Sequence, residues 1–209
     1  MEVVFFIVVL IFSIVIHEVS HGAMASALGD NTAKYAGRLT LNPIKHLDPI
    51  GSIILPVLLI LTTGKGIGWA KPVPINPYNF RDQKYGSFKV ALAGPASNFI
   101  IALIFGMAVR ILQSFEFLPF NLFSIFSFII FINLMLAVFN LIPVPPLDGS
   151  HLLFTFLPYS AQNIKIFLNQ FGPIILLFLI FFFSPFFNFL NYLINILFIF
   201  IVGFPPMIG

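Results

Sequence analysis

Long apolar runs, interrupted by short polar segments, make up most of this chain. The three longest runs cover residues 3–28, 88–112 and 121–142. Shorter runs follow at residues 152–157, 171–183 and 185–202. A helix needs about 20 residues to cross a bilayer, so the three long runs suffice, whereas Ser184-Pro185 could kink one tilted helix or separate two short ones. The pattern predicts an all-α membrane protein, a bundle of about five transmembrane helices.

The segment between the first two long runs, residues 28–89, lacks helical periodicity. Residues 34–41 alternate loosely around a glycine, and residues 70–77 contain three prolines and cannot form a regular helix. The apolar stretch 50–61 is too short for a confident span. We therefore predict a short re-entrant, β-containing insertion after the first helix, on the cytoplasmic side.

Composition places the whole chain in the membrane. Of its 209 residues, 59% are hydrophobic and 8% are charged, whereas about a quarter of a globular domain is charged. Met1-Glu2 leads into the first run without a basic region or a cleavage site, so we expect a retained helix. We interpret residues 1–209 as one integral membrane domain, with C-terminal hydrophobic helices at 171–209. Cysteine is absent, which excludes disulfides and thiolate metal sites.

The basic residues indicate the orientation of the chain. The net charge is +3, and most of the positive charge flanks the stretch 50–61. The two groups are Lys34, Arg38 and Lys45 before it, and Lys65, Lys71, Arg81, Lys84 and Lys89 after it. Positive loops stay in the cytoplasm, so the first helix should run inward and the third long helix should end at the same inner leaflet. Topology explains these charges better than nucleic-acid binding does.

The first apolar run contains an H-E-x-x-H pattern, His17-Glu18-Val19-Ser20-His21. On a helix, histidines four residues apart are separated by about 40° and about 6 Å of rise, so both imidazoles can reach one ion. Glu18 then lies where it can act as general base on a water at that ion. The alternative is a chance match whose histidines bind neighbouring carbonyls, but ionisable groups in a bilayer cost several kcal/mol.

A second polar group follows a proline cluster at the end of the third long run. Residues 140–149 read Asn-Leu-Ile-Pro-Val-Pro-Pro-Leu-Asp-Gly, and the prolines must break the helix. Asp148 then stands in an apolar setting, where a carboxylate needs a cation. Because catalytic zinc usually takes three protein ligands, Asp148 is the candidate third ligand beside His17 and His21.

Other polar residues compete for this role. The remaining carboxylates are Glu2, Asp30, Asp48, Asp82 and Glu116, of which we interpret Asp30 and Asp82 as solvated loop residues. His46 with Asp48 could form a second site, although a structural turn is the favoured interpretation. His151 could be a ligand, a partner of a ligand or a pocket wall; we favour a supporting role over direct ligation.

These motifs together resemble the site-2 protease family of intramembrane zinc metalloproteases. The matching stretches are residues 17–22, residues 140–149 with their terminal Leu-Asp-Gly, and the element Gly94-Pro95-Ala96-Ser97-Asn98. The resemblance covers the chain to about residue 157, and residues beyond 171 match only as hydrophobic helices. The chain resembles the compact branch, with no room for an inserted PDZ domain and no C-terminal regulatory domain expected.

The resemblance implies roles for individual residues. His17, His21 and Asp148 would bind one Zn²⁺ per chain, and Glu18 would be the catalytic acid and base. Asn140 and Asn98 would help to hold substrate or the oxyanion. For Asn140 a hydrogen bond between helices is an equal alternative, and for Asn98 packing is favoured over chemistry.

The resemblance also implies partners and location. Substrates would be transmembrane proteins, whose helices must unwind before cleavage, and an extended edge in the insertion could hold them by strand addition. We expect a multi-pass protein of a prokaryotic cell membrane with its active site toward the cytoplasm. The rival functions are a metal transporter, although the chain has no internal repeat, and a proteolytically silent membrane chaperone.

Overall fold

The computed structural model describes residues 2–54, 58, 61–62, 68, 70–115 and 117–205. The longer helices are α1 (Glu2–Ala27), α4 (Gly86–Ser114), α5 (Phe120–Asn140), α6 (Asp148–Phe156), α7 (Gln162–Phe182) and α8 (Ser184–Val202). The short ones are α2 (Thr32–Tyr35) and the turns η1 (Pro43–Lys45), η2 (Pro49–Ile54), η3 (Pro77–Asn79) and η4 (Tyr159–Ala161). Within the described residues, five helices are long and apolar enough to cross a membrane, which confirms the predicted all-α bundle.

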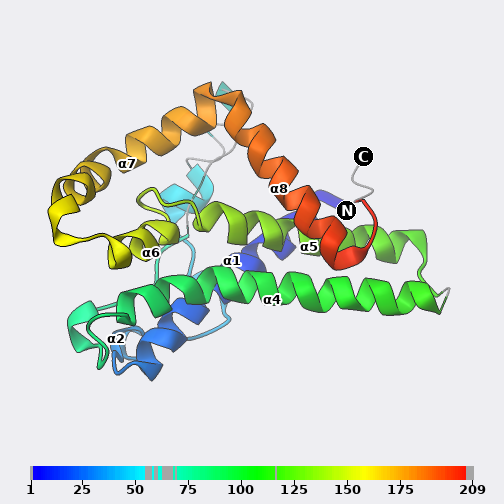
Figure 1. The fold of residues 1–209 in the computed structure, drawn as a ribbon. Helices are drawn as coiled ribbons and strands as arrows, with labels where there is room; N and C mark the ends of the chain where they lie inside the picture. The colour runs from blue at the N-terminus through cyan, green and yellow to red at the C-terminus, as the bar shows by residue number, and fades with distance from the viewer. Residues whose placement is uncertain are drawn as a thin grey trace.

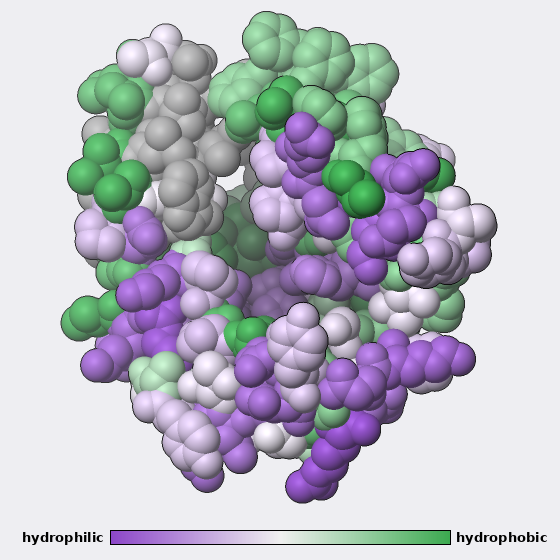
Figure 2. Space-filling view, turned by 90° about the vertical axis from the view of Figure 1, so that its left-hand side faces the viewer, coloured by the Kyte–Doolittle hydropathy of each residue, from purple (hydrophilic) through white to green (hydrophobic). Residues whose placement is uncertain are grey.

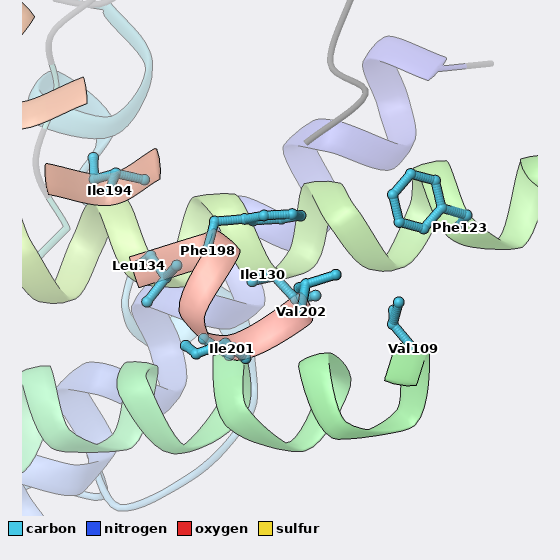
Figure 3. Packing of buried hydrophobic residues seen from close by; sticks show 9 residues of the cluster. Val109, Phe123, Ile130, Leu134, Ile194, Phe198, Ile201 and Val202 are labelled. Atoms are coloured by element: carbon cyan, nitrogen blue, oxygen red, sulfur yellow. The ribbon is translucent and has the colours of Figure 1, made fainter. Parts of the chain in front are cut away.

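The centre of the bundle is formed by α1, α4 and α5, which pack side by side (Figure 1). Lipid tails are as apolar as leucine, so helices in a bilayer associate through close packing and hydrogen bonds between them. At the end distant from the insertion, α8 closes against α4 and α5, and Figure 3 shows Phe198 and Val202 directed toward them. Gly106 permits this approach, because a Cβ there would lie 2.1 Å from Ile201 Cγ2.

The insertion between α1 and α4 differs in detail from the predicted one. Its described part carries no assigned strand, and the first two residues of the loosely alternating stretch 34–41 belong to α2 instead. Residues 70–76 are irregular, because prolines remove the backbone N–H groups that a ladder of hydrogen bonds requires. Residues 55–57 and 59–60 of the stretch 50–61 lie outside the described residues, as do Lys65 and Glu116, and η2 forms the start of that stretch.

The last two long helices start and end as their proline and polar residues dictate. α7 begins nine residues before the predicted run, at Gln162, because its first turns are amphipathic rather than apolar. It ends at Phe182, and the non-helical backbone of Phe183 separates it from α8, whose first turn contains Pro185. Of the two alternatives left open by the sequence, the structure therefore has two helices joined by a bend.

Candidate metal centre

Two histidines of α1, one helical turn apart, lie side by side on the same face of the helix. His17 and His21 are each 6% exposed, and their Nε2 atoms lie 3.1 Å apart. The spacing of four residues brings both rings to the face of α1 that packs on α4.

Asp148 reaches the same point from the other side of the proline cluster. It is the first residue of α6, and its Oδ2 lies 3.1 Å from His17 Nε2 and 3.2 Å from His21 Nε2. The chain turns sharply before it, and Gly149 is needed there because a Cβ would lie 2.2 Å from the carbonyl oxygen of Leu141. The structure thus brings together the three predicted ligands, which come from helices more than a hundred residues apart in sequence.

Each imidazole is oriented by a hydrogen bond from its other nitrogen. His17 Nδ1 lies 2.6 Å from Asn98 Oδ1, and His21 Nδ1 lies 2.7 Å from the carbonyl oxygen of Val90. Both partners accept hydrogen bonds, so both Nδ1 atoms carry protons in the neutral rings and both Nε2 lone pairs point inward. Two lone pairs and a carboxylate oxygen about 3 Å apart repel one another unless a cation lies among them.

Asn98 is itself held inside the bundle. Its side chain is fully buried and donates to Asn133 Oδ1 at 2.9 Å and to the carbonyl oxygen of Ser13 at 3.2 Å. The amide of Asn133 in turn donates to Ser13 Oγ at 3.0 Å. This network links α1, α4 and α5 and leaves the Asn98 oxygen for His17. The network therefore fixes Asn98 beside the candidate ligand His17.

Gly94 provides the space in which the two rings meet. A Cβ at this position of α4 would lie 2.4 Å from His21 Nε2 and 2.6 Å from His17 Nε2. The carbonyl of Val90 that accepts from His21 lies in the turn before Gly94. The predicted family element thus lies in the interior of α4, with Gly94 and Asn98 one turn apart along the site.

The carboxylate of Glu18 contacts the insertion between α1 and α4. Its Oε2 accepts a hydrogen bond of 2.9 Å from the backbone N–H of Val73. Within the part of the chain that the structure describes, its Oε1 has no hydrogen-bond partner. One oxygen is fixed, and the other stays free to accept a proton.

The structure places the remaining candidates elsewhere. Asn140 donates its amide to the carbonyl of Leu136 in its own helix. His46 is buried and its Nε2 lies 2.9 Å from the carbonyl oxygen of Thr40, while Asp48 caps η2 by accepting from the N–H groups of Ile50 and Gly51. His151 is not in the three-residue group, which is the one such group that the described residues form. These contacts agree with the structural turn that was favoured for His46 and Asp48.

The interpretation of Asp30 as a solvated loop residue was wrong. Its side chain is fully buried at the end of α1, where it accepts hydrogen bonds from Thr32, from the N–H of Asn76 and from the amide of Asn79. Burial alone would raise the pKa of this carboxyl, but the hydrogen bonds outweigh it and the pKa is lowered. Asp82, by contrast, does lie in an exposed loop, paired with Lys89.

The donor set fits a small divalent cation of the zinc type. Nitrogen and oxygen ligands at about 2.0–2.1 Å in a tetrahedron are about 3.3 Å apart, close to the observed separations of 3.1–3.2 Å. Two neutral imidazoles and one carboxylate also match the ligands of catalytic zinc, which leaves a fourth position open. A Cβ on Gly94 would remove the space that the ion requires.

Comparison with known proteins adds the family. Residues 108–183 match the model of "Peptidase family M50". Over 186 residues the chain is 37% identical to the "Putative zinc metalloprotease YwhC" of Bacillus subtilis, covering 87% of this chain and 81% of that protein. The chain belongs to peptidase family M50, the site-2 protease family. This M50 peptidase is a multi-pass integral membrane metalloprotease of the zinc-dependent class.

Further relatives match over smaller parts. The "Putative zinc metalloprotease Rip2" of Mycolicibacterium smegmatis is 34% identical over 66% of this chain and 52% of its own length. The "Zinc metalloprotease MJ0392" of Methanocaldococcus jannaschii is 27% identical over 70% of this chain and 32% of its own length. No solved structure matches this M50 peptidase.

Several residues at the site of this M50 peptidase escaped the sequence analysis. Asn133 and Ser13 gave the clearest available signal, because each is a polar residue within a run that is otherwise almost entirely apolar. Gly94 was noted only as part of a motif. The backbone groups of Val73 and Val90 gave no signal, since any residue carries an N–H and a carbonyl.

Proposed function

We propose that this M50 peptidase is an intramembrane endopeptidase that hydrolyses peptide bonds in or near transmembrane segments of other membrane proteins. The observation that carries the proposal is the meeting of His17 Nε2, His21 Nε2 and Asp148 Oδ2 within 3.2 Å, with Glu18 adjacent. An H-E-x-x-H helix with a distant carboxylate is the arrangement of a hydrolytic zinc site.

His17, His21 and Asp148 would hold one zinc ion per chain. When bound, zinc lowers the pKa of a water and polarises the peptide carbonyl. Asn98 and the carbonyl of Val90 orient the two rings by accepting hydrogen bonds from their Nδ1–H groups, which keeps the Nε2 lone pairs directed into the site.

Glu18 moves the protons of the reaction. Its free Oε1 takes a proton from the attacking water, and the oxygen of that water forms the new bond to the peptide carbon. As the bond between carbon and nitrogen breaks, Glu18 gives the proton to the leaving amine. Peptide and water thus become a carboxylic acid and an amine, with Glu18 returned to its starting form; the second proton of the water then passes from the acid to the amine, giving a carboxylate and an ammonium group.

The distribution of charge supports an active site on the cytoplasmic side. Apart from Lys65, which lies outside the described residues, every lysine and arginine except Arg110 belongs to the insertion, to the first turn of α4 or to the start of α7. These segments lie at the end of the bundle that carries the metal centre (Figure 1). By the positive-inside rule this end faces the cytoplasm of a prokaryotic cell.

Water must reach a site that lipid surrounds, and the same end offers a route. Figure 2 views the molecule from this end and shows a central hollow that is hydrophobic in its upper part and hydrophilic in its lower part, with hydrophilic side chains below it and to its right. The substrate helix must unwind locally, because its carbonyls are otherwise bound within the helix. Helix-breaking residues near the cleaved bond would lower that cost.

The test is reconstitution into liposomes with transmembrane peptides that carry helix-breaking residues. Glu18→Gln should abolish cleavage while leaving one zinc per chain, because it removes the base and none of the proposed ligands. Full activity in Glu18→Gln would contradict the proposed general base.

Asp148→Ala provides the complementary variant. It should lower both the zinc content and the activity, because two imidazoles alone bind zinc weakly. Unchanged stoichiometric zinc would mean that a different residue completes the site. Zinc flux into the same liposomes, with no cleavage, would instead favour the transporter rival.

A further inference from the structure

One segment of the insertion crosses α1 beside Glu18. We call residues 71–76 the strap. Its sequence is Lys-Pro-Val-Pro-Ile-Asn, so Val73 stands between two prolines and has the only backbone N–H of residues 72–74. That N–H donates to Glu18 Oε2 at 2.9 Å. The prolines restrict φ on both sides, so the direction of this N–H depends on how the strap is held.

Arg38 holds the first part of the strap. Its guanidinium is buried, and Nη2 donates to the carbonyl oxygens of Lys71 at 2.7 Å and Pro72 at 3.3 Å, while Nη1 donates to the carbonyl of Lys45. The N–H of Lys71 donates to the carbonyl of His46 at 2.9 Å. Hydrogen bonds from a charged guanidinium are stronger than neutral ones, so Arg38 gathers three carbonyls from two loops into one arrangement.

Asp30 holds the last part. Its Oδ2 accepts the N–H of Asn76 at 2.7 Å, and Oδ1 accepts the N–H of Thr32 at 3.1 Å. Asp30 follows directly from the end of α1, so it ties the strap to the helix that carries Glu18. The strap is thus fixed at both ends by buried ionisable groups of opposite charge.

Close packing keeps the middle of the strap against α1. Val73 is 5% exposed, and a Cβ on Gly22, one turn beyond Glu18, would lie 2.9 Å from Val73 Cγ1 and 2.6 Å from Leu39 Cδ2. The glycine therefore permits the approach that brings the Val73 N–H to the carboxylate.

We propose that Arg38 and Asp30 are positioning residues for Glu18, acting through the Val73 N–H at the middle of the strap. This inference rests on the proposed role of Glu18 as general base. Holding Oε2 restricts the rotation of the carboxylate and thereby the position of Oε1, and a misplacement of about 1 Å in a catalytic group can cost about 100-fold in rate. Neither residue touches the proposed zinc ligands.

The experiment compares Arg38→Gln with Lys34→Gln, which makes the same change of charge at an exposed residue of α2. Arg38→Gln should lower kcat about 10- to 100-fold with a KM within about twofold and an unchanged zinc content. Lys34→Gln should match the wild type. If Arg38→Gln raises KM while kcat stays constant, the strap serves substrate binding and the positioning role is overturned.

Hydrogen exchange of the Val73 amide gives a readout that does not need activity. Because Pro72 and Pro74 have no N–H, a peptide of residues 71–74 carries the Val73 amide as its one internal backbone N–H and isolates it in mass spectrometry. Its exchange should accelerate at least tenfold in Arg38→Gln and in Glu18→Ala. Exchange that is unchanged in both variants would overturn the inference even if the enzyme proves to be a protease.

Gly22→Ala guards against misfolding of the arginine variant. It adds one methyl group that pushes the strap away from α1 and removes no charge or hydrogen-bonding side chain. The same fall in kcat and the same faster exchange are expected. A wild type without peptidase activity would reject the proposed function, whereas an active wild type with fully active Arg38→Gln and Gly22→Ala would reject only the strap.

Discussion

At the scale of single residues, the metal centre depends on the glycine at position 94 as much as on its three candidate ligands. The three donor atoms can come within 3.2 Å of one another because Gly94 has no side chain to occupy the space between the rings and α4. The orientation of each ring is then fixed, since its Nδ1 is hydrogen-bonded to Asn98 or to the carbonyl of Val90, and its Nε2 stays directed at the proposed metal position. A ligand set alone would therefore not define the centre.

Gly94→Ala tests this directly. The added Cβ would lie 2.4 Å from His21 Nε2, so one ring must leave the cluster, and we expect zinc content to fall well below one per chain and cleavage to be lost. Metal analysis of the purified protein measures this. Gly106→Ala is the control in the same helix: its Cβ meets Ile201 far from the centre, so it should lower stability and leave zinc in place. Equal zinc content in wild type and Gly94→Ala would contradict the role given to this glycine.

At the scale of elements, the sequence predicted the helices and the meeting of His17, His21 and Asp148, but not how the insertion packs. Apolar length determines a membrane helix, and the bounds of α1, α4 and α5 fall within two residues of the predicted runs. The insertion is organised by side chains that bind backbone carbonyls and amides, as Arg38 and Asp30 do. Such contacts have no periodicity, and a buried Asp30 looks like any loop aspartate in the sequence.

The buried Asp30 makes stability depend on pH. Its folded-state pKa is lowered, so its carboxylate stabilises the fold fully above the unfolded value of about 4, and this contribution is lost as the pH falls through the folded value. Asp30→Asn should lower the free energy of unfolding near pH 7 by about 1–3 kcal/mol, because it weakens hydrogen bonds to a charged acceptor. Thermal unfolding in detergent between pH 7 and pH 3 measures both effects.

The variant should also lose part of the decrease in stability below about pH 4 that the wild type shows. Asp82→Asn is the matched control, since its exposed pair with Lys89 is of the kind that contributes little. If Asp30→Asn unfolds with the same pH profile and the same midpoint as Asp82→Asn, Asp30 is not the anchor that its contacts indicate.

At the scale of the whole molecule, α7 and α8 follow one another from the end of the bundle that carries the metal centre toward the opposite end. Leu176 and Ile180 of α7 pack with Leu147, which follows the C-terminal end of α5 and precedes Asp148. In α8, Ile194 belongs to a hydrophobic cluster with Leu134 of α5. Val202, at the end of α8, belongs to the part of the same cluster near Val109, which lies toward the C-terminal end of α4. The two helices therefore advance one after the other from the end of the bundle that carries the metal centre toward the opposite end, as Figure 1 shows for α7 and α8.

This packing predicts the topology of the C-terminal part, and the absence of cysteine from the natural sequence allows a clean measurement. Single cysteines at Tyr35 and Tyr159, which are 84% and 92% exposed, should react with a membrane-impermeant maleimide only after the cytoplasmic side is opened. Cysteines at the exposed Phe117 and Pro205 should react in intact cells. If α7 and α8 each crossed the bilayer in opposite directions, Pro205 would instead be labelled with Tyr159. That result would place the end of α8 at the cytoplasmic face, where the observed packing of Val202 against Val109 could not exist.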